Sequence, residues 1–319
     1  MKICVLDAAT LGADLDIKPF TECGEVIVYP LTSPKEVEER IKDVDVIITN
    51  KVVLNRTNLK DAKNLKLIAL LSTGYNTIDI EYAKEKGIGV ANVAGYSTQS
   101  VAQHTFAMLL HLVHHNGQYD EYVKSKQYAS SEMFTFIAWP FNELSGKTIG
   151  IIGMGAIGNA VAKIAEAFGM NVIYYSTTGK NISHERYRNV DLEELLKQSD
   201  VVSIHSPYSE KTHHLITYKE IKMMKNNAYL LNLGRGNIVV EDDLASAIND
   251  NLIAGAGIDV LSNEPIDMNN PLFKVKDQNK LFITPHIAWS SVEARNLLVR
   301  EVTDNIHAIS NGEERNRII

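Results

Sequence analysis

The sequence is poor in the residues that cross-link a chain or anchor it in a membrane. Its 319 residues include only two cysteines, Cys4 and Cys23, which do not form a C-x-x-C pair. This argues against a disulfide framework and against a zinc site. No apolar run is long enough to span a membrane, and the apolar run after Met1 lacks the cleavage pattern of a signal peptide. We therefore expect a cytoplasmic protein without a membrane partner.

Positive charge is scarce as well. Lysine and arginine number 32 against 39 aspartates and glutamates, the formal net charge is −7, and no basic block occurs. Because nucleic-acid binding requires a clustered positive surface, we expect no nucleic-acid partner. A chain of this length is long for one hydrophobic core and suits two domains.

Glycine, in contrast, is concentrated at one informative place. Gly153, Gly155 and Gly158 form the pattern G-x-G-x-x-G between an apolar run at 148–152 and a helical pattern at 159–168. Strand, tight turn and helix in this order predict a dinucleotide phosphate site. There the first glycine permits the turn, the second lets backbone amides approach the pyrophosphate, and the third lets the helix pack on its strand. The helix N-terminus then faces the phosphates.

Short apolar runs alternate with helical patterns along the whole chain, which is typical of parallel sheets covered by helices on both faces. A first group of strands is expected at 2–6, 25–29, 44–49, 67–71 and 89–93, with helical patterns at 34–42 and 80–86. A second group of six strands is expected at 148–152, 171–175, 201–205, 228–233, 254–260 and 281–285, followed by a helix at 292–310. Two α/β domains with doubly wound parallel sheets follow from this pattern.

A long helix is expected between the two groups, at 101–115. Ser100 and Gln103 have the spacing of a capping box at its start, and Asn116-Gly117 would end it. The helix is apolar around much of its circumference, so we expect it to be buried between domains or subunits. His111, His114 and His115 have ligand-like spacing but no acidic partner on that helix, and we predict no metal site.

Three polar residues lie within four residues of the ends of expected strands, where ligands bind in open α/β sheets. They are Arg235, Glu264 and His286. For each residue alone, a structural role in a turn, a cap or a loop is the better explanation. Together, behind a dinucleotide motif, they supply an anion clamp, a group that tunes a pKa, and a proton donor. A nicotinamide enzyme that reduces a 2-oxo acid requires this combination.

The segments around these residues resemble the D-isomer-specific 2-hydroxyacid dehydrogenase family. The similar segments are 232–236 (NLGRG), 257–265 (GIDVLSNEP), 284–287 (TPHI), the substrate loop 71–79 (LSTGYNTID) and the crossover 96–105 (YSTQSVAQHT). The resemblance covers nearly the whole chain. Residues 286–289 (HIAW), 293–295 (EAR) and 168–170 (FGM) are most similar to the glycerate dehydrogenase, or hydroxypyruvate reductase, branch.

The resemblance implies a Rossmann cofactor domain at 99–289 inserted into a flavodoxin-like substrate domain made of 1–98 and 290–319. It implies reversible hydride transfer between NAD(P)H and a small 2-oxo acid, with hydroxypyruvate or glyoxylate as the expected substrate. Arg235 would bind the carboxylate and polarise the carbonyl, His286 would donate the proton, and Glu264 would favour the imidazolium. Asp259 would hold the nicotinamide carboxamide.

The resemblance also gives the full set of contacts. The substrate contacts it implies are Ser72, Thr73, Gly74, Tyr75, Arg235, His286 and Trp289. The cofactor contacts it implies are Thr105, Gly153, Gly155, Ala156, Ile157, Gly158, Ser176, Lys180, Pro207, Thr212, Leu233, Gly234, Arg235, Asp259, His286 and Ala288.

The second strand of the cofactor domain departs from the NAD pattern. NAD enzymes usually place Asp or Glu at its end, to bind the ribose hydroxyls, and here that position is Ser176, followed by Thr177, Thr178, Gly179 and Lys180. We therefore predict that NADPH is accepted as well as NADH, with the preference left open.

Other activities remain open from the sequence. A phosphoglycerate dehydrogenase is less favoured, because the chain ends at Ile319 without a regulatory domain and the substrate loop lacks basic residues. An NADH-sensing corepressor would carry long partner-binding tails. The apolar helix and the irregular segment 127–142 predict a homodimer. In that segment Trp139 belongs either to a dimer arm that completes a neighbour's pocket or to a plug over its own domain.

Overall fold

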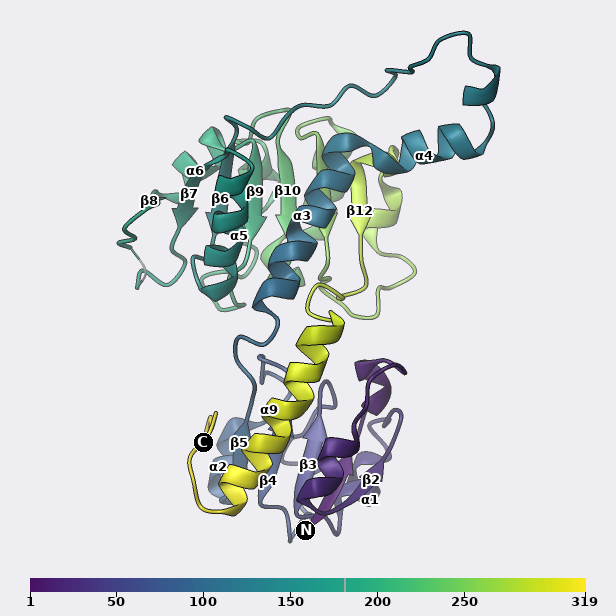
Figure 1. Cartoon of the computed structure of the whole chain (residues 1–319). Coiled ribbons are helices and arrows are strands. Elements are labelled where there is room, and N and C mark those ends of the chain that lie inside the picture. The colour runs from purple at the N-terminus through teal and green to yellow at the C-terminus, as the bar shows by residue number, and fades with distance from the viewer. Residues whose placement is uncertain (181) are drawn as a thin grey trace. The chain divides into compact units, whose positions relative to one another are not determined.

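The computed structural model describes residues 1–180 and 182–319. It divides into two units, each with one parallel sheet (Figure 1). Unit 1 comprises Met1–Ser97 and Ser290–Ile319, and unit 2 comprises Thr98–Trp289. The chain therefore leaves unit 1, forms all of unit 2, and returns to complete unit 1 with its last helix.

Unit 1 contains a five-stranded sheet in the order β2-β1-β3-β4-β5, with all strands parallel. The strands are β1 (Lys2–Val5), β2 (Glu25–Val28), β3 (Val46–Thr49), β4 (Leu67–Leu70) and β5 (Gly89–Ala91). Each lies within its expected apolar run and is one or two residues shorter. This strand order is the flavodoxin-like one, so the α/β doubly wound prediction is confirmed for this unit.

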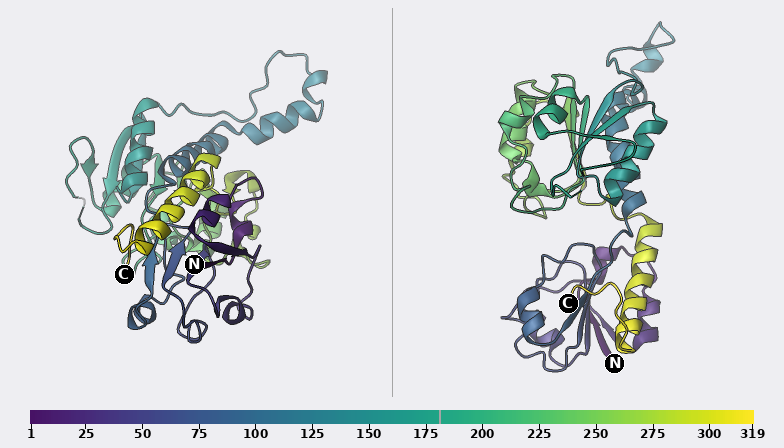
Figure 2. Two further views of the ribbon diagram at one scale, coloured as in Figure 1. Left: turned by 60° about the horizontal axis from the view of Figure 1, so that its bottom comes forward. Right: turned by 90° about the vertical axis from the view of Figure 1, so that its left-hand side faces the viewer.

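Helices cover both faces of this sheet, as the right-hand view of Figure 2 shows. On one face, α1 (Val37–Ile41) and α2 (Ile80–Glu85) share a core with Cys4, Ile47 and Ile68. On the other face, α9 (Val292–Ser310) contacts β4 and the short 3-10 helix η2 (Lys18–Cys23); a second 3-10 helix, η1, spans Ala8–Leu11. The two thiols are free and buried, and burial raises the pKa of Cys4 to about 12 and that of Cys23 to about 11.

Unit 2 contains a seven-stranded parallel sheet in the order β12-β11-β10-β9-β6-β7-β8. Its strands are β6 (Thr148–Ile152), β7 (Asn171–Tyr175), β8 (Arg188–Asn189), β9 (Val201–Ile204), β10 (Tyr229–Asn232), β11 (Gly255–Ile258) and β12 (Leu281–Ile283). This is the Rossmann order with its switch point between β6 and β9. The expected count of six strands was too low, because the two-residue edge strand β8 has a polar sequence that no apolar run marks.

Two helical layers enclose the unit 2 sheet. The layer on one face contains α3 (Thr98–His114) and α5 (Ala156–Ala167), and the layer on the other contains α6 (Leu192–Gln198), α7 (Tyr218–Ile221) and α8 (Glu241–Asn249). The remaining helices are α4 (Asn116–Lys124) and the 3-10 helices η3 (Tyr128–Ser130), η4 (Gly236–Ile238), η5 (Pro271–Lys274) and η6 (Gln278–Lys280). Within the described ranges, no helix is long and apolar enough to cross a membrane, and no cluster of three metal-ligating side chains occurs.

The expected start of helix α3 was wrong, and its expected end was one residue too late. The helix begins at Thr98, so Ser100 lies inside it, and its hydroxyl donates to the carbonyl of Ala288 at 2.6 Å instead of capping. At the other end, His115 takes a left-handed φ of 52°, and α4 begins at once with Asn116. A tertiary contact, from Ser100 to Ala288, thus replaced the expected capping box, whereas α3 does end just before the Asn-Gly pair.

Helix α4 and the loop after it extend away from the unit 2 sheet (Figure 1). None of the α4 residues, all of which the structure describes, is buried. In the loop, Phe134 is 91% exposed and Ile137 is 75% exposed. Trp139 packs edge-on against Tyr119 of α4, with ring centroids 5.0 Å apart. We call residues 116–142 the arm.

Candidate active site

The glycine turn joins β6 to α5 at the carboxyl end of the unit 2 sheet. Gly153 takes a left-handed φ of 98°, and α5 begins at Ala156 with Gly155 as its N-cap, without a side-chain capping bond. The first amides of a helix have no partner within the helix, and they lie at the positive end of its dipole. This end of α5 is therefore suited to bind an anionic group such as a pyrophosphate.

Gly155 and Gly158 have different surroundings. A Cβ placed on Gly158 would lie 2.3 Å from the carbonyl oxygen of Gly153 and 3.2 Å from Cγ2 of Ile151. Close helix packing on β6 therefore requires glycine there, as the sequence predicted. A Cβ placed on Gly155 would meet no described heavy atom within 4 Å. The space above Gly155 is open, which is what a ligand approaching the backbone requires.

We expect Gly155→Ala and Gly158→Ala to separate ligand binding from stability. Gly158→Ala forces a backbone clash and should lower the free energy of unfolding by about 1–3 kcal/mol. Gly155→Ala should melt within about 2 °C of the parent, a change below about 1 kcal/mol, and should bind NADH at least tenfold more weakly. Thermal unfolding and NADH fluorescence titration measure the two effects. The reverse pattern would show that the phosphate-site assignment of the two glycines is wrong.

The loop after β7 contains no acidic residue at the position where NAD enzymes usually have one. Ser176 is partly buried, and its carbonyl accepts a hydrogen bond from the amide of Gly179 in a turn. The amide of Lys180 donates to Oγ1 of Thr178 at 3.2 Å, and Lys180 is exposed. Residues 176–180 therefore offer hydroxyl groups and one cation. They include no carboxylate that would repel a 2′-phosphate on the ribose.

His286 and Glu264 are brought together at the ends of β12 and β11. Nδ1 of His286 lies 2.7 Å from Oε2 of Glu264, and the other carboxylate oxygen accepts the amide of Leu261 at 3.0 Å. The imidazole remains 22% exposed. Since the carboxylate accepts a hydrogen bond from Nδ1–H, the remaining ring nitrogen, Nε2, can exchange a proton with a ligand.

The backbone at His286 is held in an unusual conformation. Its φ is 55°, a left-handed value that is unfavourable for a residue other than glycine and persists only where the surroundings impose it. Asp259, 2% exposed, imposes it here: its carboxylate accepts hydrogen bonds from the amides of Ile287 and Ala288 and from the hydroxyl of Thr284. Its carbonyl accepts the amide of His286 at 2.8 Å.

Asp259 thus anchors the loop that carries His286. The sequence missed two further members of this network, Thr284 and His104. Nε2 of His104 lies 3.2 Å from Oγ1 of Thr284 and 3.8 Å from Oδ1 of Asp259. Because the Thr284 hydroxyl donates its proton to Asp259, it accepts from His104. The contact of Asp259 with a nicotinamide carboxamide stays a prediction.

Arg235 follows β10, the strand beside β11. Its Nη1 donates to the carbonyl of Gly234 at 2.8 Å, and Nδ2 of Asn232 donates to the carbonyl of Arg235 at 3.0 Å. A Cβ on Gly236 would lie 1.9 Å from the carbonyl carbon of Leu261. The Arg235 turn therefore packs directly on the segment that leads to Glu264. The three predicted catalytic residues follow three adjacent strands, β10, β11 and β12.

A second histidine follows a strand in the same unit, and it is unsuited to proton donation. His205 comes directly after β9, and Nε2 of its ring lies 2.7 Å from Oγ of Ser203. Burial lowers the pKa of His205 to about 3. The His205 ring is therefore neutral near pH 7, which excludes it as the proton donor and leaves His286 as the candidate.

In unit 1, the predicted substrate loop follows β4. The hydroxyl of Ser72 donates to the carbonyl of Gly74 at 2.6 Å, and that of Thr73 donates to the carbonyl of Val93 at 2.8 Å. In the part of the chain that the structure describes, the amides of Thr73, Gly74 and Tyr75 donate no hydrogen bond. Three consecutive amides are thus available to an anionic ligand.

The other predicted contacts differ in accessibility. Thr212 is buried, and its hydroxyl donates to the carbonyl of Pro207 at 2.9 Å. Thr105 is fully buried, with its hydroxyl donated to the carbonyl of Val101. Leu233 and Ala288 are buried, Trp289 is partly buried, and Ala156 is exposed beside the partly buried Ile157. Whether these residues touch a ligand stays a prediction.

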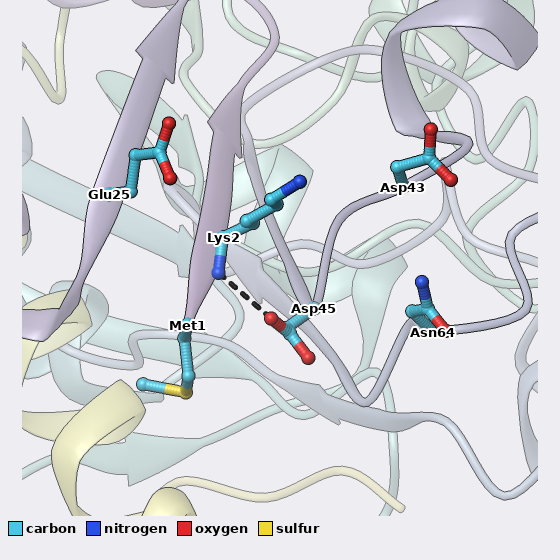
Figure 3. Close-up of a pocket in the computed structure, with 6 residues that line it drawn as sticks. All are labelled: Met1, Lys2, Glu25, Asp43, Asp45 and Asn64. Atoms are coloured by element: carbon cyan, nitrogen blue, oxygen red, sulfur yellow. Dashed lines mark hydrogen bonds between the residues drawn. The ribbon is translucent and has the colours of Figure 1, made fainter.

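The hollow drawn in Figure 3 lies at the amino ends of β1 and β2, whereas the substrate loop follows the carboxyl end of β4. It measures about 480 Å³. The Asp45 carboxylate accepts the amide of Lys2 at 2.8 Å and pairs with Lys66 at 2.9 Å. Ligands of open α/β sheets bind at the carboxyl ends of the strands. This hollow is therefore separate from the candidate site.

Comparison with known proteins agrees with this geometry. The family model described as "D-isomer specific 2-hydroxyacid dehydrogenase, NAD binding domain" matches residues 106–288. A hydroxypyruvate reductase of Blautia hydrogenotrophica is 41% identical over 99% of both chains.

Two solved structures with bound ligands are also similar. An acyclic imino acid reductase in complex with NADPH and D-Arg is 32% identical, with a TM-score of 0.87 and full coverage of both chains. A D-lactate dehydrogenase of Aquifex aeolicus, complexed with NAD and lactic acid, is 30% identical, with a TM-score of 0.85 and coverage of 98% of this chain and 96% of the other. With the strand order, the glycine turn and the His286–Glu264 pair, these similarities show that the chain belongs to the D-isomer-specific 2-hydroxyacid dehydrogenase family.

Proposed function

We propose that this protein reduces hydroxypyruvate or glyoxylate to D-glycerate or glycolate, in a reversible reaction with NADH or NADPH. The observation that carries the proposal is the 2.7 Å contact between Nδ1 of His286 and Glu264, on strand ends adjacent to Arg235. The similarity to a hydroxypyruvate reductase over 99% of both chains supports the choice of substrate. We also propose a cytoplasmic location, where free thiols such as those of Cys4 and Cys23 stay reduced.

Each catalytic side chain has a defined role in this proposal. Nε2 of His286 donates a proton to the carbonyl oxygen of the 2-oxo acid, and in the reverse direction it removes that proton. Glu264 stabilises the imidazolium and fixes its tautomer. Arg235 forms two parallel hydrogen bonds to the carboxylate and withdraws charge from the carbonyl. When bound, the reduced nicotinamide supplies the hydride.

Backbone amides and loop residues would bind the remaining parts of the cofactor and the substrate. The first turn of α5, with Gly155 and Ala156, would hold the pyrophosphate through backbone amides. The loop from Ser176 to Lys180 would face the adenine ribose. In unit 1, the amides of Thr73, Gly74 and Tyr75 would bind the substrate carboxylate.

Steady-state turnover with a panel of 2-oxo acids tests the proposal. The panel contains hydroxypyruvate, glyoxylate, pyruvate, phenylpyruvate and 3-phosphohydroxypyruvate, with NADH and NADPH each supplied in excess. We expect the highest kcat/KM with hydroxypyruvate or glyoxylate. A higher value with the phosphorylated acid would indicate a phosphoglycerate dehydrogenase. Tight NADH binding without turnover of any acid would indicate a redox sensor.

We expect the enzyme to use both nicotinamides, because the Ser176 loop lacks the carboxylate that repels a 2′-phosphate. Initial rates at equal cofactor concentrations should differ by no more than about tenfold, or about 1.4 kcal/mol. Ser176→Asp should raise the KM for NADPH at least tenfold and leave the KM for NADH within about twofold. A hundredfold preference of the parent enzyme for NADH would contradict this reading of the loop.

We also propose a homodimer in which the arm packs against a second copy of the chain. The arm exposes large apolar side chains: Phe134 is 91% exposed and Ile137 is 75% exposed. Apolar side chains clustered on a surface mark a site of protein–protein contact. Light scattering should give twice the mass of one chain. The double variant Phe134→Asp and Ile137→Asp should be monomeric, whereas Met268→Asp, which changes an exposed residue outside the arm, should not. A monomeric parent protein would contradict the proposal.

A further inference from the structure

Two buried asparagines, Asn92 and Asn305, link the substrate loop of unit 1 to α9 through hydrogen bonds. Nδ2 of Asn92, just beyond β5, donates to the carbonyl of Thr73 at 2.6 Å. Nδ2 of Asn305, on α9, donates to the carbonyl of Asn92 at 3.1 Å. Asn92 is 8% exposed and Asn305 only 1%. Buried polar side chains are retained where they are fully hydrogen-bonded, and these two connect α9 to the loop.

The C-terminal segment completes this connection. It pairs with the free edge of β5: the amide of Ile318 donates to the carbonyl of Val90, and the amide of Asn92 donates to the carbonyl of Asn316 at 3.2 Å. Nδ2 of Asn316 also donates to Oδ1 of Asn305 at 2.9 Å. A continuous series of hydrogen bonds thus runs from residue 316 through Asn305 and Asn92 to Thr73.

This series orients the peptide planes of the loop. In a trans peptide, the carbonyl and the following N–H point in opposite directions. The Ser72 carbonyl accepts the amide of Val93, the Thr73 carbonyl accepts Asn92, and the Gly74 carbonyl accepts the hydroxyl of Ser72. Each of these carbonyls is fixed, so the amides of residues 73, 74 and 75 are fixed on the opposite sides of the same planes.

Asn92 acts on the central plane of the three. Without its side-chain donor, the Thr73 carbonyl would lose its partner, and the plane shared with the Gly74 amide could rotate. An amide that must first be oriented binds a carboxylate less tightly, because the cost of ordering is subtracted from the binding free energy. The two neighbouring peptide planes would keep their hydrogen bonds, at the carbonyls of Ser72 and Gly74.

We propose that Asn92, supported by Asn305, is a positioning residue that sets the Thr73, Gly74 and Tyr75 amides to bind the substrate carboxylate. This inference rests on the proposed function, because that function supplies the carboxylate. It assigns to Asn92 an effect on KM, since the amides bind the unreacting carboxylate equally in the ground state and in the transition state.

The test compares Asn92→Ala and the isosteric Asn92→Asp, which replaces the donor NH₂ by an acceptor, with Asn296→Ala. Asn296 is an exposed residue on the same helix as Asn305, and its side chain donates to the carbonyl of Val292 at 2.9 Å. Both Asn92 variants should raise the KM for the 2-oxo acid about tenfold, with kcat within about threefold and NADH affinity unchanged. Asn305→Ala should have a smaller effect in the same direction, and Asn296→Ala none.

A lower melting temperature with an unchanged KM in both Asn92 variants would overturn the inference, because that result describes packing alone. Calorimetric binding of oxalate to the NADH complex separates this inference from the proposed function. If the parent protein reduces no 2-oxo acid but binds oxalate about tenfold more tightly than Asn92→Ala does, the proposed function fails and the inference stands. Equal oxalate affinities, or no oxalate binding by the parent, would refute the inference.

Discussion

His286→Ala should lower kcat for 2-oxo acid reduction by about 10²–10⁴-fold, the range that a positioned general acid supplies. Nε2 of the imidazole is the ring nitrogen left for a ligand, because Nδ1 is bonded to Glu264 at 2.7 Å. The glycine turn and the Ser176 loop, which would hold the cofactor, do not contact His286 through any hydrogen bond described here. NADH binding should therefore change little. Stopped-flow or steady-state rates and a fluorescence titration measure the two quantities.

Glu264→Gln is the matched control for this prediction. It keeps the size of the side chain and a hydrogen bond to the ring while removing the charge that stabilises the imidazolium. We expect an intermediate loss of kcat, because the ring keeps a hydrogen-bond partner but loses the neighbouring negative charge. If His286→Ala kept a rate near that of the parent, the proton donor would be a different group.

Arg235→Leu should lower kcat/KM by about 10²–10³-fold, or about 3–4 kcal/mol of transition-state stabilisation. The planar guanidinium can form two parallel bonds to a carboxylate and also withdraw charge from the neighbouring carbonyl. Arg235→Lys should recover only part of this loss, because the ammonium group lacks the fork. Kinetics with hydroxypyruvate measure the effect.

The control for Arg235 is Arg186→Leu, which removes an arginine that pairs with Glu166 at 3.0 Å on the surface of the same unit. Loss of an exposed ion pair costs at most about 1 kcal/mol of stability, so the variant should stay folded. Its kcat/KM should therefore remain within about twofold of the parent value. Equal losses in the two variants would mean that charge in general, and not the carboxylate clamp, explains the Arg235 effect.

The elements of both sheets were largely predictable because their strands are continuous apolar runs. Periodicity identified β1 to β7 and β9 to β12, and it placed α9 at its observed bounds. The same reasoning failed where a residue's partner is distant in sequence. The local sequence predicts Ser100 as a helix cap, but in the folded chain its hydroxyl donates to the carbonyl of Ala288. Strand β8 pairs with β7, at the edge of the sheet, and its polar sequence gives no apolar run.

The candidate site divides in the same way. The order of the residues in the sequence was sufficient to nominate Arg235, Glu264 and His286, since strand ends in a parallel sheet share one edge. The sequence did not indicate that Asp259 holds the His286 loop, or that Asn92 and Asn305 support the substrate loop. Asn305 and Asn92 are 213 residues apart in the chain, and neither belongs to a local pattern.

The amino-acid sequence was enough to establish the fold class and the dinucleotide motif and to nominate candidate reacting groups, because these depend on periodicity, spacing and side-chain type. The folded chain was needed to show which groups meet and how they are aimed. The left-handed backbone of His286, the 2.7 Å pair with Glu264 and the orientation of the Thr73 and Gly74 amides all arise from hydrogen bonds between segments that are distant in sequence. Such bonds depend on topology, which local sequence patterns do not encode.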